Sequence, residues 1–124
     1  ALLGSMQQVS PKADLIEIRL DTLKDPDCLD IKGLLRARSC PLIFTNRSRN
    51  EGGHFSGLEE ERIGLLERAI LAGADYIDLE LRTDPALRGL VLKKIQKANT
   101  KLIISYHDFT STPSMQELIE VFDS

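Results

Sequence analysis

The side chain best suited to proton transfer in this sequence is His107, in the segment Ser-Tyr-His-Asp-Phe. Histidine gains and loses protons near neutral pH, because its unperturbed pKa is about 6.5. A neighbouring carboxylate would hold one ring tautomer and raise the ring's basicity, and Glu51, Asp78 and Glu80 are the candidates. We expect His107 to be a general acid or base, the alternative being a histidine that only makes structural hydrogen bonds. The other histidine, His54, is interpreted as a loop residue.

Two arginines suit an anionic or polyhydroxylated ligand, because a guanidinium group presents planar, paired donors. Arg19 stands two residues after Glu17, and Arg47 is followed by a loop that ends in Gly52-Gly53. Alternatively, each arginine pairs with a neighbouring acid. The glycine pair either brings backbone amides close to a ligand or forms a plain turn. The two histidines and scattered carboxylates show no recognisable metal-ligand spacing, so we expect no metal site.

Four segments predict strands that could position these side chains, and helical patterns separate them. The strands are expected at residues 14–20, 41–46, 75–81 and 101–106. A capping box at Ser56–Glu59 begins one helix, which Gly73 ends. Asp84-Pro85 and Thr112-Pro113 begin two more. Successive strands start roughly 30 residues apart, the length of a βαβ unit, which predicts a parallel sheet with helices packed against it.

Each expected strand becomes polar towards its carboxyl end, on one face. Because side chains alternate along a strand, four sets share that face: Glu17, Arg19 and Asp21; Ile43, Thr45 and Arg47; Asp78 and Glu80; Ile103, Ser105 and His107. In a (β/α)₈ TIM barrel this is the rim where active sites are built. Charges that satisfy one another in a barrel core are the alternative. An open doubly wound sheet would also bind ligands there, but no glycine-rich nucleotide motif is present.

Composition excludes several classes of partner. The net charge is -3 and no basic face is evident, which argues against nucleic acid. No apolar run approaches the ~20 residues that cross a membrane. Cys28 and Cys40 are expected to be free thiols in a reducing cytoplasm, since residues 1–10 do not resemble a signal peptide. Residues 1–11 and 116–124 are interpreted as helices at the two ends of the four strands, a unit that could be half a barrel or a piece of an open sheet. We interpret residues 1–124 as a fragment, one partial TIM-barrel domain truncated at both ends.

Taken together, these motifs resemble those of type I 3-dehydroquinate dehydratases. The resemblance covers residues 13–113 and rests on Glu-Ile-Arg-Leu-Asp at 17–21, Thr-Asn-Arg at 45–47 followed by Glu-Gly-Gly at 51–53, Asp-Tyr-Ile-Asp-Leu-Glu at 75–80, and Ser-Tyr-His-Asp-Phe at 105–109 with Thr-Pro at 112–113. It implies a (β/α)₈ barrel that dehydrates 3-dehydroquinate to 3-dehydroshikimate. This is the third step of the shikimate pathway, which leads to the aromatic amino acids.

The resemblance also implies a role for each matched residue. A family lysine forms a Schiff base with the substrate ketone, His107 removes the C2 proton and later helps water to leave, and Glu51 partners His107. The substrate-binding residues would be Glu17, Arg19 and Arg47, and Asp78 would support the site from behind. No metal or organic cofactor is implied.

The family lysine would lie beyond Ser124, and Lys101 does not match it. The resemblance therefore covers strands two to five of the barrel, and we expect the 124-residue chain alone to be inactive. The main alternative is a half-barrel that binds or assembles without catalysis, two copies of which could close a barrel as a homodimer. Another Schiff-base lyase or aldolase is a more distant alternative.

Overall fold

The computed structural model describes residues 14–106. The predictions for His107, for the helix after Thr112-Pro113 and for a helical start at residues 1–11 lie outside the described residues. Within this described part, no helix is both long and apolar enough to cross a membrane.

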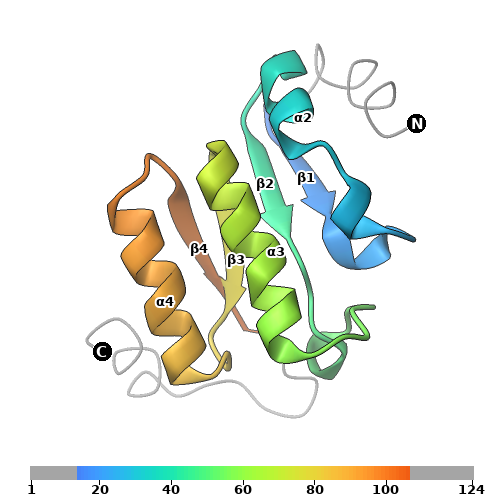
Figure 1. Ribbon diagram of the computed structural model, residues 1–124, viewed down its shortest axis with the longest axis vertical. Coiled ribbons are helices and arrows are strands. Elements are labelled where there is room, and N and C mark those ends of the chain that lie inside the picture. The colour runs from blue at the N-terminus through green and yellow to red at the C-terminus, as the bar shows by residue number, and fades with distance from the viewer. Residues whose placement is uncertain (1–13, 107–124) are drawn as a thin grey trace.

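The described part is built on a four-stranded parallel sheet (Figure 1). Its strands are β1 (Ile16–Arg19), β2 (Leu42–Thr45), β3 (Tyr76–Glu80) and β4 (Lys101–Ser105), and each pairs with the next along the chain. All four predicted strands are confirmed, each slightly shorter than expected. In a doubly wound sheet the strand order reverses at a switch point. Here the order is strictly sequential, as in a barrel wall.

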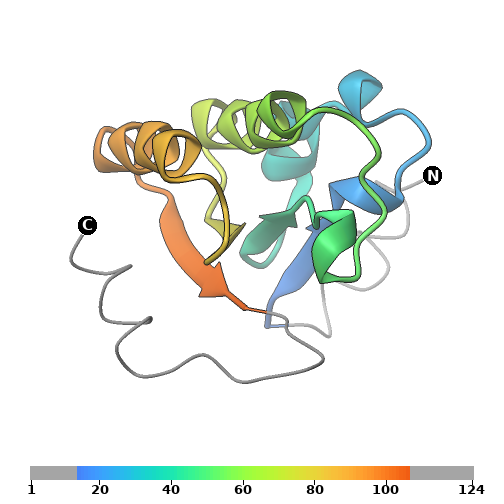
Figure 2. The same ribbon diagram turned by 90° about the horizontal axis from the view of Figure 1, so that it is seen from below.

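Three helices cover one face of this sheet, as Figure 2 shows in a view turned by 90°. They are α2 (Ile31–Ala37), α3 (Glu59–Ala72) and α4 (Pro85–Gln96). Three short 3₁₀ turns lie in the connections: η2 (Leu20–Thr22), η3 (Pro26–Cys28) and η4 (Arg49–Glu51). We call the other side of the sheet the helix-free face, a term that refers to residues 14–106 alone.

The hydrophobic core lies between the sheet and the helices. Every second strand residue points into it, and α3 supplies the apolar residues that meet them. The fully buried members include Leu20, Leu42, Phe44, Ile63, Leu66, Ala69, Ile77, Leu79 and Val91. Because one set of alternate residues is used for packing, the other set must lie on the helix-free face. The predicted division of each strand into two faces is confirmed.

Two of the three helix ends predicted from capping residues are confirmed. Asp84 caps α4 by accepting hydrogen bonds from the backbone of Ala86 and Leu87, and Gly73 ends α3 with a left-handed φ of 99°. The capping box predicted at Ser56 is wrong: the N-cap of α3 is Leu58, and no side chain caps it. The physical reason is that the Glu59 carboxylate, needed to complete the box, binds Arg62 instead.

Candidate active site

Polar side chains from two neighbouring strands, β3 and β4, converge on the guanidinium of Arg47, just past the end of β2. Arg47 Nη1 lies 2.9 Å from Glu80 Oε1 and 3.0 Å from Asp78 Oδ1, and donates to Ser105 Oγ at 2.6 Å. Ser105 Oγ in turn donates to Asp78 Oδ1 at 2.6 Å. The strand register produces this cluster, because Thr45 pairs with Asp78 and Glu80 with Ser105. Parallel strands thus bring residues far apart in the sequence to one edge of the sheet.

Asp21, in η2, links the carboxyl ends of β1 and β2 through its hydrogen bonds. Its side chain is fully buried and accepts from Arg19 Nε at 3.0 Å and from Arg19 Nη2 at 2.7 Å. It also accepts from the backbone amides of Arg47 and His54, each at 3.1 Å. Burial raises the pKa of Asp21, but these hydrogen bonds, led by those from Arg19, outweigh it and hold the pKa below its usual value. Asp21 is therefore a charged anchor that orients Arg19 and fixes the backbone at Arg47.

Glu17 lies on the helix-free face of β1, where it is exposed and accepts a hydrogen bond from Thr45 Oγ1 at 2.7 Å. Arg19 is on the same strand two residues later, with 34% of its side chain exposed. Both positions are open to a ligand on that face. The structure places these two side chains near the carboxyl end of β1, as predicted, and their role in substrate binding stays a prediction.

The loop after Arg47 folds into a tight turn that buries Glu51. Gly52 has a left-handed φ of 84°, and a Cβ atom at Gly53 would lie 2.1 Å from the Arg47 carbonyl oxygen. The amide of Gly53 donates to Ser48 O at 2.8 Å. Both glycines are thus needed by the turn itself, as in the plainer of the two alternatives. The pairing of Glu51 with His107 stays a prediction, because His107 lies outside the described residues.

A second group of charges, missed by the sequence reasoning, lies behind Arg47 on the helix side. Arg62 of α3 is 1% exposed and donates from Nη1 to Glu80 Oε2 and, at 2.9 Å, to the Asn46 carbonyl oxygen. Its Nε and Nη2 donate to the two carboxylate oxygens of Glu59 at 2.6 and 2.9 Å. Burial raises the pKa of Glu80 to about 7, although Arg62 and Arg47 oppose the shift. The burial of Arg62 could have been predicted from the sequence, because Arg62 shares a helical face with Leu66 and Ala69.

A hollow of about 370 Å³ opens beside this group. It lies between the loops that follow β2 and β3 and is lined by Ser48, Asn50, Glu51, Glu59, Arg62, Glu80, Arg82 and Thr83. No group of three or more histidine, cysteine or carboxylate side chains within residues 14–106 is placed to hold a metal ion. What the described side chains offer a ligand is hydrogen bonding and charge.

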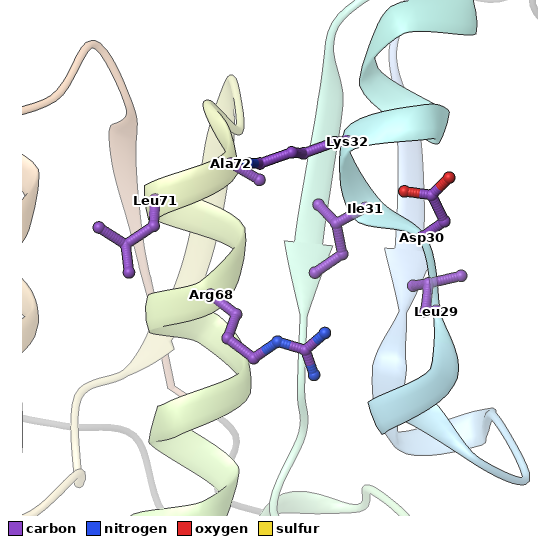
Figure 3. A pocket seen from close by; sticks show the side chains of 7 residues that line it. All are labelled: Leu29, Asp30, Ile31, Lys32, Arg68, Leu71 and Ala72. Atoms are coloured by element: carbon purple, nitrogen blue, oxygen red, sulfur yellow. The ribbon is translucent and has the colours of Figure 1, made fainter.

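Another hollow lies in the helix layer, between the start of α2 and the end of α3 (Figure 3). Its volume is about 280 Å³, and its lining combines the apolar Leu29, Ile31, Leu71 and Ala72 with Asp30, Lys32 and Arg68. None of these residues belongs to the strand ends around Arg47. The helix-layer hollow is therefore separate from the candidate active site.

Comparison with known proteins agrees with this architecture. The model of the family described as type I 3-dehydroquinase matches residues 1–124. A 3-dehydroquinate dehydratase from Methanococcus maripaludis strain C7 is 38% identical over 121 residues, which are 98% of this chain and 54% of the relative. The Desulfotalea psychrophila enzyme is 41% identical over 111 residues, 90% of this chain and 48% of the relative.

A solved structure shows the same arrangement of elements. The type I 3-dehydroquinate dehydratase of Clostridium difficile, determined with covalently modified comenic acid, superposes with a TM-score of 0.80 at 29% identity. The match covers 96% of this chain and 50% of that structure. The chain spans about half the length of the curated relatives it matches. Its four parallel strands are accordingly part of a TIM barrel, and the chain belongs to the type I 3-dehydroquinase family.

Proposed function

We propose that this chain supplies part of the active site of a type I 3-dehydroquinate dehydratase, a lyase that converts 3-dehydroquinate to 3-dehydroshikimate. One observation carries the proposal: Arg47, Asp78, Glu80 and Ser105 meet at the carboxyl ends of three neighbouring strands. In TIM-barrel enzymes this is where catalysis takes place. Membership of the family supports this chemistry for the rim.

In the proposed mechanism, the substrate's hydroxyl groups lie against the helix-free face and its ketone condenses with a lysine beyond Ser124. The resulting iminium is a better electron sink than the ketone, so the adjacent C2 proton becomes more acidic. His107 removes that proton and later protonates the departing hydroxyl group, which leaves as water. Glu51 would orient His107 and raise its basicity. The covalently modified comenic acid of the C. difficile relative supports a covalent step.

Substrate binding would fall to Glu17, Arg19 and Arg47, with Asp78 as a supporting residue. Arg47 Nη1 lies 3.0 Å from Asp78 Oδ1, and Glu17 accepts a hydrogen bond from Thr45 of β2, so a neighbouring strand holds each of these side chains. We further propose a cytoplasmic protein, which is supported by the free thiols of Cys28 and Cys40. A small-molecule substrate, rather than nucleic acid, fits a net charge of -3.

The test is to trap the Schiff base in the full-length protein. Dehydroquinate and borohydride are added, and the intact mass is measured before and after digestion. We expect a stable adduct on a lysine C-terminal to His107, and the same adduct in a Lys101→Ala control, since Lys101 is exposed at the start of β4. A folded protein that binds substrate without forming an adduct would exclude the Schiff-base mechanism and favour a binding module. The 124-residue chain alone is expected to form no dehydroshikimate.

A further inference from the structure

A line of four alternating charges runs through the sheet, from the helix layer to the helix-free face. Glu59 binds Arg62 through two hydrogen bonds, Arg62 binds Glu80 Oε2, and Glu80 Oε1 receives Arg47 Nη1 at 2.9 Å. Glu80 is the link between the two arginines, with one carboxylate oxygen committed to each. Glu80 is thus one of three groups that bind Arg47 Nη1, with Asp78 and Ser105, and the only one of the three whose other oxygen is bound by Arg62 of α3.

Arg62 is buried and hydrogen-bonded through its whole guanidinium group. Its side chain is 2% exposed and its three guanidinium nitrogens all donate within this group. Its backbone carbonyl oxygen accepts from Asn46 Nδ2 at 3.1 Å, while Nη1 donates to the Asn46 carbonyl oxygen. This reciprocal pair fixes the start of α3 against the residue that precedes Arg47. A lysine could not also bind both carboxylate oxygens of Glu59, because an ammonium group has no planar fork.

We propose that Arg62 is a positioning residue for the dehydratase reaction, holding Glu80 so that Arg47 is correctly placed against the substrate. The inference rests on the proposed function, since Arg47 is the residue through which Arg62 would act. Arg62 itself lies in the helix layer and needs no contact with the substrate.

The electrostatics of Glu80 support this role. Glu80 faces the positive charges of Arg62 and Arg47 and the negative charges of Asp78 and Glu51, and burial already raises its pKa to about 7. Removing the charge of Arg62 would leave more negative than positive charge around Glu80. Its carboxyl group would then stay protonated to higher pH and would bind Arg47 less tightly. Loss of Arg62 should therefore weaken the hold on Arg47 even in a protein that still folds.

The experiment compares Arg62→Met, Arg47→Met and the double variant in the full-length protein, with Arg68→Met as control. Arg68 lies on the same helix but is exposed, and its distance to Asp27 Oδ1 is 3.7 Å. We expect Arg62→Met to raise the KM for 3-dehydroquinate about tenfold while kcat per borohydride-trapped site falls less than about threefold. The double variant should have the KM of Arg47→Met alone, because Arg62 acts through Arg47. Arg68→Met should match the wild type.

Three results would overturn the inference: an unchanged KM in folded Arg62→Met, a double variant whose effects multiply, or an equal change in Arg68→Met. If Arg62→Met fails to fold, Arg62→Lys is used instead, because it keeps the positive charge and loses the planar guanidinium group. A KM raised at least about threefold supports the proposal, and a wild-type KM refutes it. A wild-type protein without any turnover would overturn the proposed function and this inference with it. If the wild type is active, a negative result with the Arg62 variants overturns only the role of Arg62.

Discussion

Replacing Asp21 by asparagine removes a single charge from the point that ties Arg19 to the backbone of Arg47. The two side chains have nearly the same size, so the change leaves no cavity and its effect is electrostatic. In the wild type, Oδ1 accepts from Arg19 Nε and the Arg47 amide, and Oδ2 accepts from Arg19 Nη2 and the His54 amide. In either orientation of the new amide group, its NH₂ faces one arginine N–H and one backbone N–H.

The size of the effect follows from these contacts. The ion pair with Arg19 contributes about 1 kcal/mol, because the arginine is 34% exposed and screened by solvent. One backbone amide, at Arg47 or His54, loses its acceptor within a buried site, which costs about 1–3 kcal/mol. We therefore expect Asp21→Asn to lower the free energy of unfolding by about 2–4 kcal/mol at neutral pH.

The pH dependence gives an independent check on the cause. The folded-state pKa of Asp21 is lowered, so its contribution is fully present above the usual carboxyl pKa of 3.8 and is lost as the pH falls through the folded value. Urea unfolding of the full-length protein should therefore show a large difference between wild type and Asp21→Asn at pH 7 and a small one in strong acid. Asp27→Asn is the matched control, since the Asp27 side chain is 82% exposed, and it should change stability by less than about 0.5 kcal/mol.

An electrostatic role for Asp21 would be refuted if the free energy of unfolding of Asp21→Asn were within about 0.5 kcal/mol of the wild-type value at pH 7. It would also fail if the difference were as large in strong acid as at neutral pH, because the loss would then not come from the carboxylate charge.

Three further changes test other parts of the structure by urea unfolding of the full-length protein. Burial raises the pKa of Glu80 to about 7, so its contribution to folding stability is full below the usual pKa of 4.5 and is lost as the pH rises through the folded value. Glu80→Gln should therefore remove about 2 kcal/mol of the pH dependence of the free energy of unfolding between about pH 5 and pH 8, and an unchanged pH dependence would contradict this. Asp84→Ala should cost about 1 kcal/mol through loss of the α4 cap, and Asp84→Asn clearly less. Gly73→Ala should cost about 1 kcal/mol, because alanine is strained at a φ of 99°. Gly64→Ala, inside α3 with open space around it, should instead stabilise the protein by about 0.5–1 kcal/mol. Changes in stability of the same sign at both positions would contradict this difference in backbone conformation.

The strands could be predicted because their periodicity is simple. Alternate residues pack against the helices, and the intervening ones become polar at the carboxyl end. The helix α2 was not predicted as a separate element, since it has only seven residues and contains Gly33. Its signal was present: Asp30 caps it by accepting from Gly33 N at 3.0 Å. The misplaced cap at Ser56 has a different cause, because a side chain that fits one local motif can be bound by another neighbour in the sequence, as Glu59 is by Arg62 in the same helix.

The candidate site was predictable where it is built from strands and less so where a helix contributes. Placing Asp78, Arg47 and Ser105 on one face needed only the alternation of side chains. Periodicity places Arg62 on the buried face of α3, but it does not show that the side chain reaches Glu80. Asp21 was placed on the correct face, but its contacts with the Arg47 and His54 amides arise from the turn η2. Turn geometry of this kind is not specified by spacing alone.

The pairing of both arginines narrows what part of a substrate they can bind. Arg19 is matched by Asp21, and Arg47 by Asp78 and Glu80, so neither guanidinium offers an unbalanced positive charge. A carboxylate brought to Arg47 would be repelled by the negative charge of Asp78, 3.0 Å from Arg47 Nη1. A hydroxyl group carries no charge and can accept from a guanidinium while donating to a carboxylate. We therefore propose that Arg19 and Arg47 bind hydroxyl groups of the substrate, and that the positive charge balancing its carboxylate comes from another residue.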